Sequence, residues 1–177
     1  MRIIFCGGGT LGSVTPLLAT IEKLKELEPE AVSVWVGTRR GVERAVVGKS
    51  KIEYHWICAA KLRRYFDLRL LAAPFLLAAA VAQSIRLMVI LRPKAVVACG
   101  SFVQVPLIMV ARTFGVPVII HQEDVEAGLA NRISAYDAKV ITADDLTHCG
   151  RLAPTLSHRH LSDAGEDAQE PGAPIHL

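Results

Sequence analysis

Cys6-Gly7-Gly8-Gly9-Thr10-Leu11-Gly12-Ser13-Val14-Thr15-Pro16 is the most informative segment of the sequence. It joins a short apolar run, residues 1–5, to residues 17–27, where leucine and isoleucine recur at helical spacing. The sequence therefore predicts a strand, a glycine-rich turn and a helix, with Thr15 and Pro16 at the cap and first-turn positions. Such a turn leaves backbone N–H groups unpaired at the positive end of the helix dipole, where an anion can bind. The alternative is a tight turn without a ligand, and four glycines in six residues favour the ligand site.

Length and composition limit the class of protein. A chain of 177 residues makes about one domain and buries a sizeable core. Hydrophobic residues make up 51% of it and the mean hydropathy is +0.35, which indicates extensive buried parallel sheet, a membrane-facing surface, or both. The net charge of +3 gives no argument for nucleic acid, so no nucleic-acid partner is expected. The four cysteines form no CxxC pair and no metal-ligand pattern, which fits a reduced cytosolic compartment.

Strand-like and helix-like segments alternate along most of the chain. The expected strands are residues 1–5, 31–36, 54–57, 95–98, 116–120 and 138–142, and the expected helices are residues 17–27, 42–47, 70–85, 105–114 and 128–135. This alternation predicts an α/β fold with a doubly wound parallel sheet. Ligands of such sheets bind at the carboxyl ends of the strands, so we expect the site there. The segments at that edge would be residues 7–13, 37–38, 100–104 and 121–124.

The apolar segment 70–85 is bracketed by Arg69 and Arg86. A membrane span needs about 20 predominantly apolar residues, so its length argues against a span. We expect a helix with Pro74 near its start, packed on the core and touching the membrane surface with one face. The membrane contacts would be Lys61, Arg63, Arg64, Arg69, Phe75 and Leu76, the basic ones meeting anionic headgroups. The alternative is a buried helix preceded by a solvated basic loop.

The glycine stretch also satisfies the dinucleotide-binding pattern GxGxxG. That function requires an acidic residue after the second strand to hold the ribose hydroxyls. The chain instead has Gly37-Thr38-Arg39-Arg40, which would fit at most a phosphorylated ribose. A P-loop is excluded because no Gly-Lys-Ser/Thr follows the glycines.

Residues 8–16 resemble the GGTGGHxxP loop of the MurG family, the N-acetylglucosaminyltransferases that convert lipid I to lipid II in peptidoglycan synthesis. Four further segments resemble family motifs in the same order. They are residues 36–38 with Glu43 (LGT…ME), residues 71–74 (the start of a membrane-associated helix), residues 100–103 with Pro106 (GGYVSGP), and residues 115–124 with 127–131 (GIPVVLHEQN…AGLTN). The resemblance covers about residues 1–145, and five collinear motifs are more specific than any one of them.

The resemblance implies the Rossmann-like N-terminal half of a GT-B glycosyltransferase. In this family the N-terminal domain handles the lipid-linked acceptor and the membrane, and the C-terminal domain supplies most contacts to UDP-GlcNAc. The implied reaction is an inverting transfer of GlcNAc to lipid I, undecaprenyl-diphospho-MurNAc-pentapeptide, and it needs no cofactor and no metal. The implied substrate-binding residues are Gly9, Thr10, Leu11, Gly12, Ser101, Phe102, Gln122, Asp124 and Asn131.

Two segments depart from the family pattern and supply the candidate catalytic residues Ser13, Glu123 and Asp124. Ser13 replaces the loop histidine; a serine can hydrogen-bond a phosphate but cannot act unaided as a base near neutral pH. The family's HEQN reads His121-Gln122-Glu123-Asp124, which exchanges an acid and an amide. Glu123 or Asp124 could deprotonate the acceptor hydroxyl, and the alternative is that either caps the following helix.

The predicted domain of acceptor and membrane binding covers residues 1–147. Residues 148–177 lack periodicity and read as a disordered tail, in which His148, His158 and His160 are spaced too irregularly for a metal site. The family's donor domain is absent, as a truncation or a frameshift would also leave it. We expect a half-enzyme that acts with a separate donor-domain subunit, bound peripherally at the cytoplasmic face of the cell membrane. The alternatives are a non-catalytic binding module for lipid-linked diphosphate sugars and, with least support, an NADP-dependent oxidoreductase.

Overall fold

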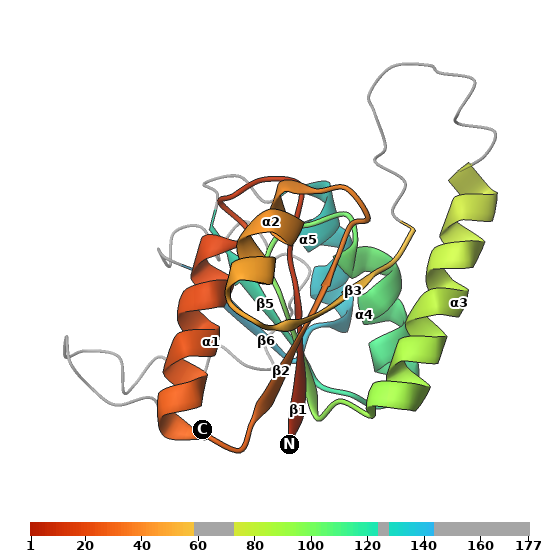
Figure 1. Ribbon diagram of the computed structural model, residues 1–177. Helices are drawn as coiled ribbons and strands as arrows, with labels where there is room; N and C mark the ends of the chain where they lie inside the picture. The colour runs from red at the N-terminus through yellow and green to blue at the C-terminus, as the bar shows by residue number, and fades with distance from the viewer. Residues whose placement is uncertain (59–72, 124–127, 144–177) are drawn as a thin grey trace.

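Six parallel strands and five helices make up the part of the chain that the computed structural model describes, residues 1–58, 73–123 and 128–143 (Figure 1). The strands are β1 (Arg2–Cys6), β2 (Val32–Gly37), β3 (Glu53–Trp56), β4 (Ala95–Ala98), β5 (Val118–Gln122) and β6 (Val140–Ala143). The helices are α1 (Thr15–Leu27), α2 (Val42–Lys49), α3 (Ala73–Leu91), α4 (Gln104–Thr113) and α5 (Leu129–Ser134), followed by the short 3-10 turn η2 (Ala135–Asp137).

The sheet order is β3-β2-β1-β4-β5-β6, and every neighbouring pair is parallel. The chain runs outward from β1 to β3, returns to place β4 on the other side of β1, and then continues outward to β6. The expected doubly wound sheet is therefore confirmed. Its topological switch point lies between β1 and β4, directly below the glycine-rich loop (residues 7–14).

Alternate side chains of the central strand β1 enter two separate cores. Ile3 and Phe5 pack with α1 on one face of the sheet, around Leu17 and Ile21. The opposite face, which includes Ile4 and Cys6, packs on α3 and α4. Figure 1 shows α1 and α2 on one side of the sheet and α3 and α4 on the other. Burial on both faces is why the strands read as continuous apolar runs.

The N-terminus of α1 differs from the expectation in one detail. Val14, with helical backbone angles, occupies the cap position, and no side chain caps the helix. Thr15 is the first residue of the helix, and its hydroxyl donates to the Leu11 carbonyl at 3.1 Å. The prediction that Thr15 caps α1 is therefore wrong, because its side chain already bonds within the preceding turn. Pro16 lies in the first turn, as expected.

Helix α3 is longer than the sequence indicated. It continues past Arg86 to Leu91, because Leu87, Met88 and Leu91 pack into the core while Arg86 faces outward. The window Pro74–Leu91 is long and apolar enough to cross a membrane by length and composition, and 28% of it is buried. The argument from length against a span is therefore wrong. A core helix of a soluble protein meets the same two criteria, so they do not show a span either.

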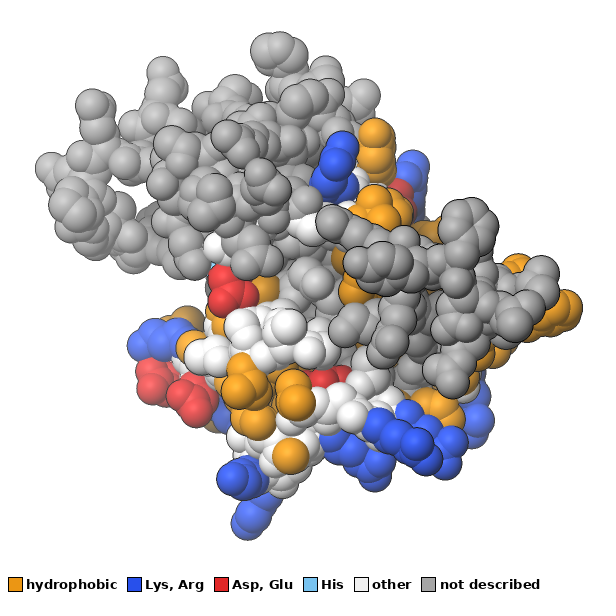
Figure 2. All heavy atoms as spheres, turned by 90° about the horizontal axis from the view of Figure 1, so that it is seen from above, with side chains coloured by type: hydrophobic (Ala, Val, Ile, Leu, Met, Phe, Trp, Pro, Cys, Tyr) orange, Lys and Arg blue, Asp and Glu red, His pale blue; other side chains and the backbone are white. Residues whose placement is uncertain are grey.

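Helix α3 packs on α4 but leaves apolar side chains exposed in its first turn and further along its length. Phe75 is 78% exposed, and Leu76, Leu77, Ile85, Val89 and Ile90 are exposed beside it along the helix. We call these six residues the outer face of α3. Figure 2 shows hydrophobic side chains gathered at the end of the molecule where α3 lies in Figure 1. The predicted membrane contacts Lys61, Arg63, Arg64 and Arg69 lie outside the described residues, as does the predicted tail 148–177.

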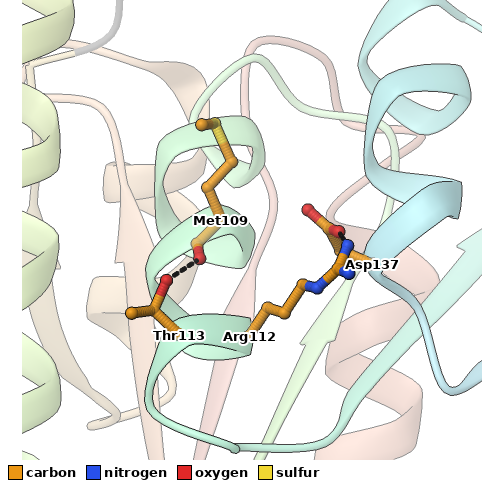
Figure 3. Close-up of polar contacts among 4 residues, drawn as sticks. All are labelled: Met109, Arg112, Thr113 and Asp137. Atoms are coloured by element: carbon orange, nitrogen blue, oxygen red, sulfur yellow. Dashed lines mark hydrogen bonds and ion pairs between the residues drawn. The ribbon is translucent and has the colours of Figure 1, made fainter.

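The last turn of α4 is tied to η2. Arg112 Nη1 forms an ion pair with Asp137 Oδ1, and the Thr113 hydroxyl donates to the Met109 carbonyl at 3.0 Å (Figure 3). Together with the contacts between α4 and α5, this pair fixes the segment that leads into β6.

Candidate functional site

The carboxyl ends of the strands meet at the upper edge of the sheet in Figure 1. Cys6, the last residue of β1, is in register with Val36 of β2 and Ala98 of β4, and Ala98 is in register with Ile120 of β5. The loops that follow β1, β2, β4 and β5 therefore share this edge, as the sequence predicts.

The glycine-rich loop is closed from within by Ser13. This residue is buried, its hydroxyl oxygen accepts the Gly8 N–H at 3.2 Å, and the hydroxyl also lies 3.2 Å from the Thr10 carbonyl oxygen. Gly9 has a φ of +90°, a conformation that glycine adopts without strain. Trp35 Nε1 donates to the Gly7 carbonyl at 3.1 Å and anchors the start of the loop. The hydroxyl of Ser13 thus shapes the loop, and a catalytic role for it stays a prediction.

The tip of the loop faces solvent. Thr10 and Leu11 are exposed and Gly12 is half-buried. Among the described residues, no hydrogen-bond partner is found for the backbone N–H groups of Thr10, Leu11 and Gly12. These donors lie just before the N-terminus of α1, where the helix dipole favours negative charge. A loop with this geometry can bind phosphate or sugar oxygens, and such binding stays a prediction.

The carboxylate of Glu123 lies against the glycine-rich loop at Gly12. A Cβ added to Gly12 would come within 3.0 Å of Glu123 Oε1, and the Cys99 thiol lies 4.0 Å from Glu123 Oε2. Glu123 is half-buried. The predicted catalytic residue Glu123 and the predicted binding loop are thus adjacent, and a side chain at position 12 would press on the carboxylate. Asp124, the other candidate base, lies outside the described residues.

A second carboxylate, that of Glu43 in α2, is fully buried against the glycine-rich loop at Gly9. It accepts hydrogen bonds from the Gly9 N–H at 3.2 Å, the Thr38 N–H at 2.8 Å and the Thr38 hydroxyl at 2.6 Å. Burial alone would raise the pKa of Glu43, but the hydrogen bonds from Thr38 and Gly9 hold that pKa below its usual value. In the sequence Glu43 is a motif match and is predicted to have no further role. Its one early signal is that it is the only acid between Gly37 and Gly48.

Asn131 is the centre of a buried network of amides. Its Oδ1 accepts from the Gly100 N–H at 3.1 Å and from Gln104 Nε2 at 2.7 Å, and its Nδ2 donates to Gln122 Oε1 at 2.6 Å. Gln104 Nε2 also donates to Ser134 at 3.2 Å. The network joins the loop after β4 to the end of β5 and to α5.

The predicted substrate contacts Ser101, Gln122 and Asn131 are all buried, whereas Phe102 beside them is 36% exposed. Ser101 is hydrogen-bonded to the first residue of α4. Its N–H donates to Gln104 Oε1 at 3.2 Å, and its carbonyl accepts the Gln104 N–H at 3.0 Å. The structure therefore brings these residues together at the predicted edge but gives their polar groups partners within the protein. Direct contact with substrate stays a prediction for them.

Two other kinds of site find little support in this part of the chain. The described ranges contain no group of three or more histidine, cysteine, aspartate or glutamate residues that could hold a metal ion. The position after β2, where a dinucleotide fold needs a free carboxylate, has Thr38 and Arg39, and the Arg39 guanidinium lies 5.4 Å from the centre of the Trp56 ring. The nearest acid, Glu43, is already bonded to Thr38 and Gly9.

Comparison with known proteins gives one consistent result. The family model described as the glycosyltransferase family 28 N-terminal domain matches residues 3–142. A protein of Clostridium kluyveri is 39% identical over 98% of this chain and 46% of its own length, and one of Clostridium novyi is 41% identical over 76% of this chain and 37% of its own length. Both are named UDP-N-acetylglucosamine–N-acetylmuramyl-(pentapeptide) pyrophosphoryl-undecaprenol N-acetylglucosamine transferase. This chain spans less than half the length of either relative.

Solved structures agree. The crystal structure of MurG from Acinetobacter baumannii matches with a TM-score of 0.69 and 26% identity, over 82% of this chain and 42% of that one. The UDP-GlcNAc 2-epimerase of Neisseria meningitidis matches with a TM-score of 0.62 at 10% identity, over 87% of this chain and 43% of that one, which shows a shared fold.

Proposed function

This chain belongs to glycosyltransferase family 28, whose N-terminal domain it contains, and from that membership we propose that it is the acceptor half of an N-acetylglucosaminyltransferase. The proposed reaction moves GlcNAc from UDP-GlcNAc to lipid I and yields lipid II. The observation that supports this most directly is the 39% identity over 98% of the chain to a relative named for that transfer.

The proposed chemistry uses the glycine-rich loop and the carboxylate beside it. The open N–H groups of Thr10, Leu11 and Gly12 bind oxygens of the acceptor diphosphate or of the donor sugar. The acceptor hydroxyl attacks the anomeric carbon of GlcNAc, the bond from that carbon to the phosphate oxygen of UDP breaks, and the configuration inverts. Glu123 accepts the proton of the attacking hydroxyl, since its carboxylate lies against Gly12. Asp124 is the second candidate for that proton.

A donor-binding domain is needed to complete this site. The described residues form one sheet, whereas more than half of the length of each of the two relatives lies outside the match. We infer that UDP-GlcNAc binds across this domain and a second one, whether that domain is a separate subunit or a continuation of the chain. The domain proposed here covers residues 1–147, and residues 148–177 are proposed not to belong to it.

A transfer assay tests the proposal. The chain is assayed with UDP-GlcNAc and a lipid I analogue, alone and together with the C-terminal half of the Clostridium kluyveri relative. Transfer in the combined sample supports the enzyme half. Glu123→Gln should then lower kcat by about 10²-fold or more, while the matched control Glu53→Gln, an exposed acid on β3, should not.

Absence of transfer in both samples, with binding of the lipid analogue retained, would contradict the enzyme reading and leave the binding module. A titration with NADPH tests the remaining alternative, and saturable binding would support an oxidoreductase instead.

We also propose that the chain is peripheral to the cytoplasmic face of the membrane, bound through the outer face of α3. The support is the exposure of Phe75, Leu76 and the other apolar side chains of that face, next to a basic segment in the sequence. Each basic residue near an anionic surface adds about 1 kcal/mol of binding free energy.

Co-sedimentation with vesicles tests the membrane proposal. Binding should be stronger to vesicles containing anionic lipid than to neutral ones, and the double variant Phe75→Ser/Leu76→Ser should weaken it. Leu27→Ser is the matched control, because Leu27 is 63% exposed at the end of α1, away from α3. Equal binding by all three proteins would refute the role of α3, and resistance to alkaline extraction would indicate a span.

A further inference from the structure

Glu43 is a buried charge whose hydrogen-bonding groups come from two loops of the site. Its Oε2 accepts the N–H of Gly9 in the glycine-rich loop, and its Oε1 accepts both the N–H and the hydroxyl of Thr38 after β2. No ion pair of the described residues includes it. A buried carboxylate is costly unless such donors satisfy it, so the carboxylate and the two loops depend on each other.

Glycines make the space for this carboxylate. A Cβ on Gly41 would come within 1.9 Å of Glu43 Oε2, and a Cβ on Gly8 within 2.5 Å of Glu43 Oε1. Gly37 is also close, since its Cβ would lie 3.1 Å from Glu43 Cγ. A ligand in the loop does not account for Gly37 and Gly41, because both lie beyond β1 and its loop. The carboxylate accounts for Gly41 and Gly8, whereas a Cβ on Gly37 would meet the Tyr54 hydroxyl first, at 2.5 Å.

The hydrogen bond between Glu43 and Gly9 affects the backbone N–H groups of residues 10–12, which are proposed to bind the ligand. Gly9 is the residue with the φ of +90°, and the exposed tip Thr10–Gly12 follows it immediately. Because Glu43 engages the Gly9 N–H, the path of the chain into the tip is fixed from the protein side, and that N–H is not available to a ligand. Ligand oxygens are left with the donors of Thr10, Leu11 and Gly12.

We propose that Glu43 is a positioning residue of the transferase site: its carboxylate ties the glycine-rich loop to the loop after β2 and so presents the N–H groups of residues 10–12 to the acceptor. This assignment rests on the proposed function for the identity of the ligand, but the positioning itself does not. The role requires a carboxylate and not only a side chain of that size. A glutamine has one acceptor oxygen and would turn an NH₂ group toward N–H or O–H donors.

The test is Glu43→Gln, read first by amide hydrogen exchange. Loss of the Gly9 contact should raise the exchange rate of the Gly9 amide by about tenfold, while amides of β4 and β5 keep their protection. Glu22→Gln, an exposed acid on α1, is the matched control and should change neither. If Glu43→Gln unfolds the protein, Thr38→Val removes a single donor and should raise exchange in residues 8–12 by a smaller factor. Unchanged exchange at Gly9 in the folded variant would overturn the proposal.

The second readout separates this inference from the proposed function. In the transfer assay with the donor half, Glu43→Gln should raise KM for the lipid acceptor more than it lowers kcat, since the reacting groups remain. A fall in kcat as large as the rise in KM, or no change in either constant, would overturn the positioning role. If the wild-type chain shows no transfer, the proposed function fails, and the exchange experiment still decides whether Glu43 holds the loop.

Discussion

Replacement of Asn131 by alanine is the most demanding test of the buried amide network. The substitution removes the acceptor of the Gly100 N–H at 3.1 Å and of Gln104 Nε2 at 2.7 Å, and the donor to Gln122 Oε1 at 2.6 Å. A fourth bond, to the His121 carbonyl, is longer at 3.4 Å. Gln104 keeps its bond to Ser134, whereas the N–H of Gly100 loses its partner.

These contacts set the expected magnitude. Three well-formed hydrogen bonds at about 1 kcal/mol each, with a buried N–H left unsatisfied, give a loss of roughly 3 kcal/mol in the free energy of unfolding. A domain of this size has a total of about 5–15 kcal/mol, so the variant should still fold in water. Because the network joins β4, β5 and α5, the loss should appear as a lower urea midpoint with an unchanged slope.

The assay is urea unfolding at neutral pH, followed by circular dichroism. Arg132→Ala is the matched control, since Arg132 is the next residue of α5, is exposed and has no side-chain hydrogen bond among the described contacts. It should change the free energy of unfolding by less than about 0.5 kcal/mol. A loss below about 1 kcal/mol for Asn131→Ala would refute the reasoning, because each of these bonds contributes about that much when it is intact.

Three further predictions concern backbone and charge. Gly100→Ala should lower the free energy of unfolding by about 1–2 kcal/mol in the same urea assay, because Gly100 has a φ of +67°; no loss would mean that the loop relaxes. Gly48→Ala should instead raise it by about 0.5–1 kcal/mol, because Gly48 lies inside α2 and an added Cβ meets nothing within 4 Å; a destabilised protein would contradict this. The pKa of Glu43 is held below its usual value, so its contribution to stability is present above the ordinary carboxyl range and is lost as the pH falls through the folded-state value. Unfolding free energy measured against pH should therefore fall less steeply at acid pH in Glu43→Gln than in the wild type, and identical acid limbs would show that Glu43 does not contribute.

The sheet could be predicted from the sequence because few topologies satisfy its pattern. Right-handed crossovers and alternating strands and helices restrict the possible orders, and the pattern predicts β4 (Ala95–Ala98) at its observed bounds. The end of α3 could not be predicted in the same way. Arg86 interrupts the apolar run in the sequence, but it faces outward on a helix whose next buried residues are Leu87 and Met88.

The candidate site likewise has features that the sequence predicts and features that it does not. The meeting of the glycine-rich loop with Glu123 follows from strand ends that share one edge, so it was predictable. The amide network was not, since Gly100, Gln104, Gln122 and Asn131 are separated by up to 31 residues and meet only in the folded chain. The role of a single residue cannot be read from the sequence for that reason: a polar residue near a predicted edge can face the ligand or a buried partner, and the local pattern does not distinguish the two.

The hydrogen bond from Trp35 to the Gly7 carbonyl gives the loop its own optical reporter. Trp35 is fully buried, whereas Trp56, the other tryptophan, is 42% exposed at the sheet edge. A soluble quencher such as iodide should therefore suppress the emission of Trp56 first. The residual fluorescence then comes from an indole bonded to the base of the glycine-rich loop. Its wavelength and intensity can follow movement of that loop when acceptor or anionic lipid is added, without a label.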